Sequence, residues 1–152
     1  MALFKPTKQK EKLIKQFRLQ VKTELEDLNL IFDWFRKNAQ TILSEQSYWQ
    51  CQVALAEGFS NTVKYAHQNL SPTTPIDLEI NVFANYLEIR IWDWGEEFNL
   101  KNTMITLPQI NRDPLEREGG RGLQFMSQFT DDLQYIRTSN QRNCLILKKN
   151  IK

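Results

Sequence analysis

The stretch from Ile76 to Gly95 reads IDLEINVFANYLEIRIWDWG and contains two runs in which apolar and polar residues alternate. A period of two predicts strands that are buried on one face. The runs cover residues 76–83 and 86–92, and the short connection between them predicts a β-hairpin. The second strand leads directly to Asp93, so the hairpin places a carboxylate at a strand end.

Further elements are expected on both sides of this hairpin. They are a strand over 13–21, helices over 25–40 and 47–68, a short helix over 123–129, and a final hairpin with strands over 133–138 and 144–148. The segment 96–118 shows no clear periodicity and contains two prolines. Because such a long loop inside a compact domain is usually functional or disordered, we expect it to form a mobile lid.

Length and composition indicate one globular domain. The chain has 152 residues, 41% of them hydrophobic and 25% charged, which is ordinary for a soluble domain with a sizeable core. We expect a flexible, Lys-rich tail over 1–12 and a single domain over 13–152. A net charge of +2 does not favour direct nucleic-acid binding. No stretch is long and apolar enough to span a membrane, and lysines interrupt any leader-like region, so a cytoplasmic protein is expected.

The second predicted helix carries a carboxylate and an amide four residues apart, Glu57 and Asn61. This spacing places both on one helix face. An amide oxygen suits Mg²⁺, which often takes only one or two protein ligands beside phosphates and water, and a neighbouring carboxylate can accept a proton. Lys64 could reach phosphate oxygens. Taken alone, the pair is as well explained by a polar helix surface.

Asp93 and Gly95 form the second motif. A carboxylate in an apolar pocket can accept the N6 amino hydrogen of adenine, and a glycine permits the backbone to approach the base closely. Taken alone, an Asp-x-Gly sequence is more often a simple turn.

The third motif, Gly119-Gly120-Arg121-Gly122, is expected to be a loop before the short helix that begins at Leu123. Glycines allow backbone N–H groups to converge on an anion, and a helix N-terminus favours negative charge. Arg121 could add a charge-assisted contact to phosphate. The occurrence of the three motifs together and in this order favours a nucleotide site over an unrelated polar helix face, turn and loop. The absence of a Gly-x-x-x-x-Gly-Lys-Ser/Thr run excludes a P-loop.

The motifs together resemble those of the Bergerat-fold (GHKL) ATPases, and in particular the anti-sigma-factor serine/threonine kinases of the RsbW/SpoIIAB type. Residues 54–65 resemble the N box of that family, residues 91–98 its G1 box, and residues 114–123 its G2 box. The resemblance covers nearly the whole chain after about residue 12. It implies an α+β fold, a two-layer sandwich in which helices cover one face of a mixed, largely antiparallel sheet.

The resemblance also implies a function and roles for the site residues. ATP and Mg²⁺ would be the cofactors, and the chain would phosphorylate a serine of an anti-anti-sigma (STAS) protein, possibly bind a sigma factor, and form a homodimer. Glu57 would be the general base and Asn61 the Mg²⁺ ligand. The nucleotide would contact the residues Asn61, Lys64, Tyr65, Asp93, Gly95, Gly119, Gly120, Arg121, Gly122 and Leu123.

Two positions depart from the family pattern. Glu97 stands where Gly or Pro is common, and Ile146 is the nearest match to a polar residue that supports the adenine-binding Asp. Two alternatives to a kinase also remain. One is a noncatalytic module whose protein binding is gated by ATP. The other is a detached histidine-kinase catalytic domain. This alternative is disfavoured because His67 is the only histidine and no dimerisation helix pair precedes it. His67 itself is expected to be exposed at a helix end.

Overall fold

The computed structural model describes residues 11–97 and 118–151, and for residues 118–123 it describes the backbone but not the side chains. The predicted tail and the predicted lid lie almost entirely outside these residues. Their mobility, and the division of the chain into a tail and a single domain, remain predictions.

The described chain forms one five-stranded sheet. The strands are β1 (Lys15–Lys22), β2 (Pro75–Val82), β3 (Tyr86–Asp93), β4 (Asp132–Arg137) and β5 (Asn143–Asn150). Their order across the sheet is β1-β2-β3-β5-β4, and each neighbouring pair is antiparallel. The predicted hairpins are confirmed. The expected mixture of parallel and antiparallel strands is not found in the described part of the chain.

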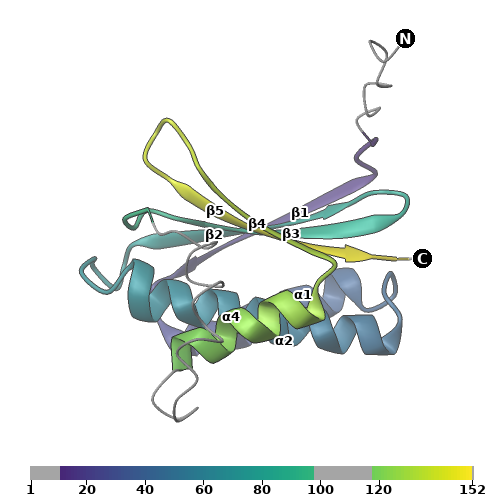
Figure 1. The fold of residues 1–152 in the computed structure, drawn as a ribbon, viewed down its shortest axis with the longest axis horizontal. Helices are drawn as coiled ribbons and strands as arrows, with labels where there is room; N and C mark the ends of the chain where they lie inside the picture. The colour runs from purple at the N-terminus through teal and green to yellow at the C-terminus, as the bar shows by residue number, and fades with distance from the viewer. Residues whose placement is uncertain (1–10, 98–117, 152) are drawn as a thin grey trace.

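The helices are α1 (Leu28–Ala39), α2 (Glu45–Asn61) and α4 (Glu118–Phe129), with a 3₁₀ turn η1 (Leu25–Asp27) before α1 and a π-helical turn η2 (Thr62–Ala66) directly after α2. Figure 1 shows all three α-helices on the same face of the sheet. The fold is therefore the expected two-layer α+β sandwich. None of the described helices is long and apolar enough to cross a bilayer.

Alternation along the strands explains why only one face is covered. In β3, Leu87, Ile89 and Ile91 are almost completely buried, whereas the intervening residues are partly exposed. The buried set points toward the helices and packs against the large side chains of α1 and α2, including Phe35, Leu55 and Phe59. This apolar contact holds the two layers together.

Two helix boundaries differ from those expected. The second helix begins after Ser44, whose hydroxyl accepts a hydrogen bond from the Ser47 N–H at 3.1 Å, and changes to a π-helical turn after Asn61. Helix α4 begins at Glu118 rather than at Leu123, so the glycine segment forms its first turn instead of a loop before it. Glycine is a poor helix former, and its low propensity hid this turn from sequence analysis.

Candidate nucleotide site

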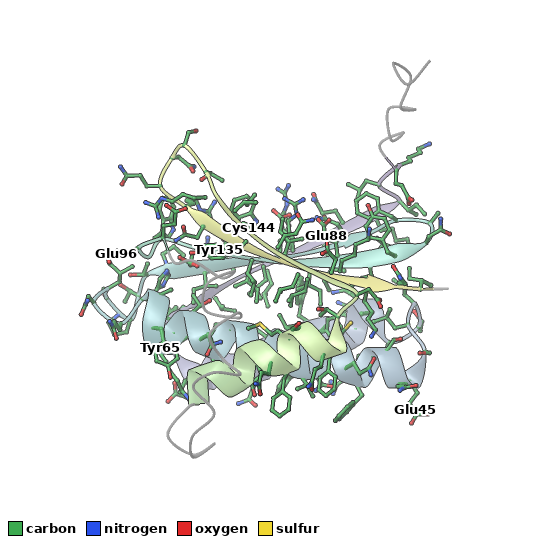
Figure 2. The ribbon with its side chains drawn as sticks, viewed as in Figure 1. Glu45, Tyr65, Glu88, Glu96, Tyr135 and Cys144 are labelled. Atoms are coloured by element: carbon green, nitrogen blue, oxygen red, sulfur yellow. The ribbon has the colours of Figure 1, made fainter. Side chains whose placement is uncertain are left out.

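A cavity of about 770 Å³ lies between the helical layer and one end of the sheet. This volume is within the range of about 300–1,000 Å³ typical of small-molecule sites. The described part of its lining comes from α2, η2 and the turn that follows it, the end of β3 and the turn after it, α4, and the β4–β5 hairpin. The lining residues are Gly58, Asn61, Thr62, Tyr65, Ala66, Gln68, Asn69, Leu70, Asp93, Trp94, Gly95, Glu96, Glu97, Met126, Tyr135, Arg137, Gln141 and Leu145. Figure 2 shows Tyr65 on the helical layer and Glu96 beside the sheet at the same end of the molecule.

Asp93 is the acidic group at the end of β3 and is only 4% exposed. Its Oδ1 accepts hydrogen bonds from the Gly95 N–H at 2.8 Å and from Asn143 Nδ2 at 2.9 Å. These two donors fix the orientation of the carboxylate. Its Oδ2 accepts no hydrogen bond from the described residues, and it can therefore accept one from a ligand in the cavity that Asp93 lines.

Asn143 supports Asp93 from the neighbouring strand. The two residues are register partners in the β3–β5 pair. Asn143 is fully buried; its Nδ2 also donates to the Gly95 carbonyl at 2.8 Å, and its Oδ1 accepts from Arg137 Nη1 at 3.0 Å. The support is thus provided by Asn143 and not at Ile146, which pairs with Arg90 and Gln134 farther along the strands.

Gly95 is required by contact with the protein itself. A Cβ at this position would lie 2.3 Å from the Ala66 carbonyl oxygen and 2.8 Å from its carbonyl carbon. Neither backbone atom can move without displacing η2, so any larger residue would push the turn after β3 away from the helical layer. The expectation that a glycine is needed here is therefore supported, but the close neighbour in the described structure is the backbone of η2.

His67 is buried, with 1% of its surface exposed, and the expectation of an exposed helix-end residue was wrong. Its Nε2 accepts a hydrogen bond from the Trp94 N–H, and its Nδ1 lies 2.9 Å from Thr23 Oγ1. Burial lowers the pKa of His67, and the nearby charge of Asp93 partly opposes this shift. The sequence offered no signal for this position, because its partners come from two distant parts of the chain, at Thr23 and at Asp93–Trp94.

Asn61 and Glu57 lie one turn apart on α2, as the spacing predicted. Asn61 is half-buried, lines the cavity, and makes no side-chain hydrogen bond with the described residues, so its amide oxygen is available to a cation. Glu57 is also half-buried but is not among the described residues that line the cavity. Of the two residues, only Asn61 is therefore among those described as lining the cavity.

The backbone around Asn61 departs from regular helix. Thr62 Oγ1 donates to the Gly58 carbonyl at 3.0 Å, and the His67 N–H bonds to the Thr62 carbonyl at 2.8 Å, five residues back. Single π-helical turns occur frequently at functional sites. Here the turn carries Tyr65 to the cavity wall and His67 into the interior.

The remaining predicted residues divide into two groups. Tyr65 and Lys64 are both exposed, Tyr65 by 48%. Tyr65 lines the cavity, and Lys64 is not among the lining residues described. Gly119, Gly120, Arg121, Gly122 and Leu123 lie in the first turns of α4. Because their side chains are outside the described part of the structure, their contact with phosphate remains a prediction.

The charges of the described lining are mostly negative. Asp93, Glu96 and Glu97 lie on or directly after β3, while Arg137 is held by the Gly95 carbonyl at 3.2 Å and by Asn143. A neutral base with an amino group suits this end of the cavity, since it brings a donor and no negative charge. No cluster of three or more acidic, His or Cys side chains suited to a metal occurs in the described residues, so a Mg²⁺ ion here would depend on Asn61, phosphate and water.

The described chain is thus an α+β domain with a one-sided antiparallel sheet, in which a buried carboxylate and a helix amide line the same cavity. Residues 21–149 match the family model described as "Histidine kinase-like ATPase domain". The chain belongs to this family.

Individual relatives agree with this assignment. The chain is 32% identical over 107 residues to the serine-protein kinase RsbW of Oceanobacillus iheyensis, a match that covers 68% of this chain and 65% of that protein. It is 30% identical over 91 residues to the RsbW of Staphylococcus epidermidis, covering 58% of this chain and 57% of that protein. The chain thus spans less than two thirds of the length of each of these relatives, and within its family it resembles the RsbW-type anti-sigma kinases.

A solved structure shows the same fold. A chain of the SiaB–SiaC complex from Pseudomonas aeruginosa superposes with a TM-score of 0.64 and 12% identity, over 91% of this chain and 90% of that one. At this identity the similarity concerns the fold alone.

Proposed function

We propose that the chain is an ATP-dependent serine kinase of a partner-switching module and that it phosphorylates a serine of a STAS-domain protein. The observation that carries the proposal is the oriented carboxylate of Asp93. One oxygen is held by Asn143 and the Gly95 N–H, and the other can accept the N6 amino hydrogen of adenine. The RsbW-type relatives, which are serine-protein kinases by name, support the reaction type.

The residues divide the work by chemistry. Asn61 would bind Mg²⁺, which neutralises charge on the phosphates during transfer. The backbone N–H groups of Gly119 and Gly120, which lie in the first turn of α4 and have no acceptor within the helix, would bind phosphate oxygens together with Arg121. Gly122, Leu123, Lys64 and Tyr65 would complete the site. Glu57 would take the proton of the serine hydroxyl as the serine Oγ–P bond forms and the bond from the γ-phosphorus to ADP breaks.

Nucleotide binding is tested first. We expect Asp93→Asn to weaken ATP binding about tenfold to a hundredfold, because the loss of a charge-assisted hydrogen bond costs about 1.5–3 kcal/mol. Calorimetry with ATP and Mg²⁺ measures this change. Glu96→Gln, which removes a charge from the same cavity wall, is the matched control and should bind nearly normally. Equal affinity in Asp93→Asn and the wild type would remove Asp93 from the site.

Phosphoryl transfer is tested with radiolabelled ATP and a candidate STAS protein. General-base action supplies about 10²–10⁴-fold in rate, so Glu57→Gln should bind ATP and the partner but transfer little phosphate. Asn61→Ala should lose Mg²⁺-dependent binding as well as transfer. If Glu57→Gln transfers phosphate at the wild-type rate, the chain is still a kinase, but Glu57 is not its general base.

A noncatalytic module gated by ATP is the second candidate function. The observation that favours it is the position of Glu57, which is half-buried outside the described cavity lining. In that case the wild type would bind a STAS partner only with ATP present and would transfer no phosphate. His67, the chain's only histidine, is a poor phosphate acceptor because both ring nitrogens are engaged. The proposed homodimer is tested separately by light scattering.

A further inference from the structure

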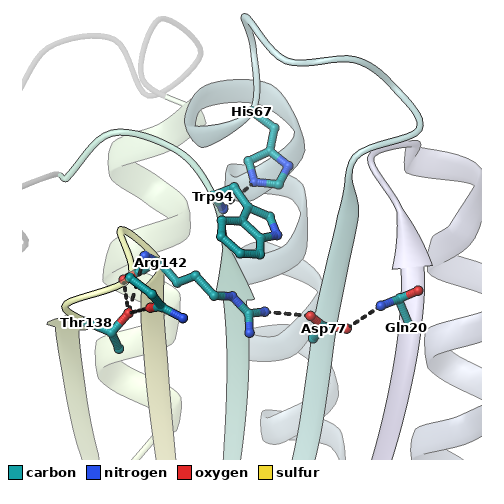
Figure 3. A network of polar contacts seen from close by, with 7 residues as sticks. Gln20, His67, Asp77, Trp94, Thr138 and Arg142 are labelled. Carbon is teal, nitrogen blue, oxygen red and sulfur yellow. Dashed lines mark hydrogen bonds and ion pairs between the residues drawn. The ribbon is translucent and has the colours of Figure 1, made fainter.

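His67 connects the nucleotide site to two distant parts of the chain. It follows η2 directly, and both of its ring nitrogens are used although no sequence motif includes it. Figure 3 shows its ring pointing at the backbone of Trp94, the residue between Asp93 and Gly95. This contact joins η2 to the turn that carries Asp93.

The directions of the hydrogen bonds are determined by the donors. The Trp94 N–H donates to His67 Nε2 at 2.9 Å, so Nε2 carries no proton and the neutral ring is protonated on Nδ1. Nδ1 therefore donates to Thr23 Oγ1 at 2.9 Å, and the Thr23 hydroxyl donates to the Thr74 carbonyl at 2.7 Å. Each donor in this chain of three bonds is used once, and each bond is short enough to be strong.

The turn that carries Asp93 is thus held from two sides. From β5, Asn143 binds Asp93 Oδ1 and the Gly95 carbonyl. From η2, His67 binds the Trp94 N–H, and the Ala66 backbone packs against Gly95. If the His67 contact were lost, the Trp94 N–H would lose its acceptor, and on the helical side only the packing of Gly95 against Ala66 would still hold the turn.

We propose that His67 is a positioning residue of the nucleotide site: by holding the Trp94 N–H, it fixes the turn from Asp93 to Gly95 in the geometry that accepts adenine. This inference rests on the proposed function, because it assigns His67 a role in the same site. His67 touches no reacting atom. Its contribution is to affinity and base selectivity and not to the transfer step.

Two amide substitutions separate the two ring contacts. In His67→Gln the side-chain oxygen can occupy the place of Nε2 and keep the Trp94 contact, while the bond to Thr23 is lost. In His67→Asn the amide nitrogen can occupy the place of Nδ1 and keep the Thr23 contact, while the shorter chain cannot reach Trp94. Each variant loses one hydrogen bond, so their stabilities should be similar.

We expect His67→Asn to bind ATP about three- to tenfold more weakly than the wild type, with little change in any affinity for GTP and no change in the rate of transfer at saturating ATP. His67→Gln should bind ATP nearly as the wild type does. Thr23→Val is the matched control, because it removes the hydrogen bonds on the other side of the His67 ring, to His67 Nδ1 and to the Thr74 carbonyl. It should lower the free energy of unfolding without lowering the affinity for ATP. Calorimetry with each nucleotide and Mg²⁺ measures these affinities.

A second measurement does not depend on ATP. Without nucleotide, amide exchange at residues 93–95 should be faster in His67→Asn than in His67→Gln, because only the latter keeps an acceptor for the Trp94 N–H. Equal exchange and equal ATP affinity in the two variants would overturn the inference. If the wild type binds no ATP while the two variants still differ in exchange, the proposed function is refuted, and only the structural part of the inference, that His67 holds the turn from Asp93 to Gly95, is supported.

Discussion

The side chain of Asn143 is the point at which strand β5 touches the site. Its amide group bridges Asp93, the Gly95 carbonyl and Arg137 while fully buried. We expect Asn143→Ala to lower the free energy of unfolding by about 1–3 kcal/mol, because several buried polar groups lose a partner, and to weaken ATP binding. Urea denaturation and calorimetry measure the two effects. Asn150→Ala, an exposed change at the end of the same strand, should alter neither.

Gly95 and Gly58 make different demands on space. A Cβ at Gly95 meets fixed backbone of Ala66, whereas a Cβ at Gly58 meets first the end of the Ile91 side chain at 2.7 Å. A side-chain end can shift more easily than backbone, so Gly95→Ala should be the more destabilising change, within the range of about 1–3 kcal/mol typical of overpacking. Thermal unfolding of the two variants compares them; a larger loss in Gly58→Ala would contradict this account of the turn.

His67 makes stability depend on pH. Burial lowers its pKa in the folded protein, with Asp93 opposing, whereas the unfolded chain takes up the proton near its ordinary pKa of about 6.5. Below that value the unfolded state binds more protons, so the free energy of unfolding should fall as the pH decreases toward the lower folded pKa. The loss should be smaller in His67→Gln, whose side chain does not titrate. Urea denaturation at about pH 7.5 and about pH 5.5 measures both.

Lys149 connects three elements at the other end of α4. It lies on the helix-facing side of β5, and its Nζ donates to Gln50 Oε1 of α2 at 2.6 Å and to the carbonyl of Phe129, the last residue of α4, at 2.9 Å. A cation at a helix C-terminus is favourable by about 0.3–2 kcal/mol. We expect Lys149→Met to lose stability of this order in chemical denaturation. Lys148→Met is the neighbouring control, because Lys148 lies over the Tyr86 ring on the opposite face.

The face of the sheet away from the helices carries a polar layer of its own. Gln20 and Arg142 both bind the carboxylate of Asp77, and the Arg142 guanidinium stacks over Trp92 and Trp94 at 5.0 and 4.7 Å from the ring centres. Part of this network is visible in Figure 3. In the described part of the chain no helix covers this face, and paired polar groups allow it to meet water.

Both cysteines are buried, one on the helical side of the sheet and one on the opposite side. Cys51 lies in α2 and Cys144 on the outer side of β5, and burial raises the pKa of each thiol to about 12. At about pH 8 roughly one thiol in 10⁴ is ionised in the folded protein, and the thiolate is the reactive form. We expect a colorimetric thiol reagent to label neither until urea unfolds the chain. Single Cys→Ala variants assign the reaction, and prompt labelling of either thiol would mean that its layer opens locally.

Sequence patterns predicted the architecture well because period-two alternation and helix-face spacing are local. The hairpin around residues 76–92 and the pairing of Glu57 with Asn61 on one helix needed no tertiary information. The early start of α4 could not be predicted, because glycine has a low helix propensity. The π-helical turn over Thr62–Ala66 could not be predicted because no local pattern distinguishes it from ordinary helix.

Sequence analysis identified residues of the cavity only where a motif marked them, and their roles toward a nucleotide stay predictions. Asn61, Tyr65, Asp93 and Gly95 do meet at one cavity. Asn143 and His67 were missed because each acts through residues far away in sequence. Asn143 is 50 residues from Asp93 in the sequence. The one local sign of its contact with Asp93 was its position as a polar residue directly before an apolar strand.

The position of Trp94 gives the protein an intrinsic optical reporter. Trp94 is one of the described residues that line the cavity, is 42% exposed, and has the Arg142 guanidinium over its ring. Indole emission depends on solvent and on nearby charge, so a nucleotide that enters the cavity should change the fluorescence spectrum in proportion to occupancy. Trp94→Phe should abolish this change and Trp49→Phe, an exposed residue outside the described cavity lining, should preserve it. Nucleotide titrations, and the kinetics of filling the site, could then be followed in unlabelled protein by light alone.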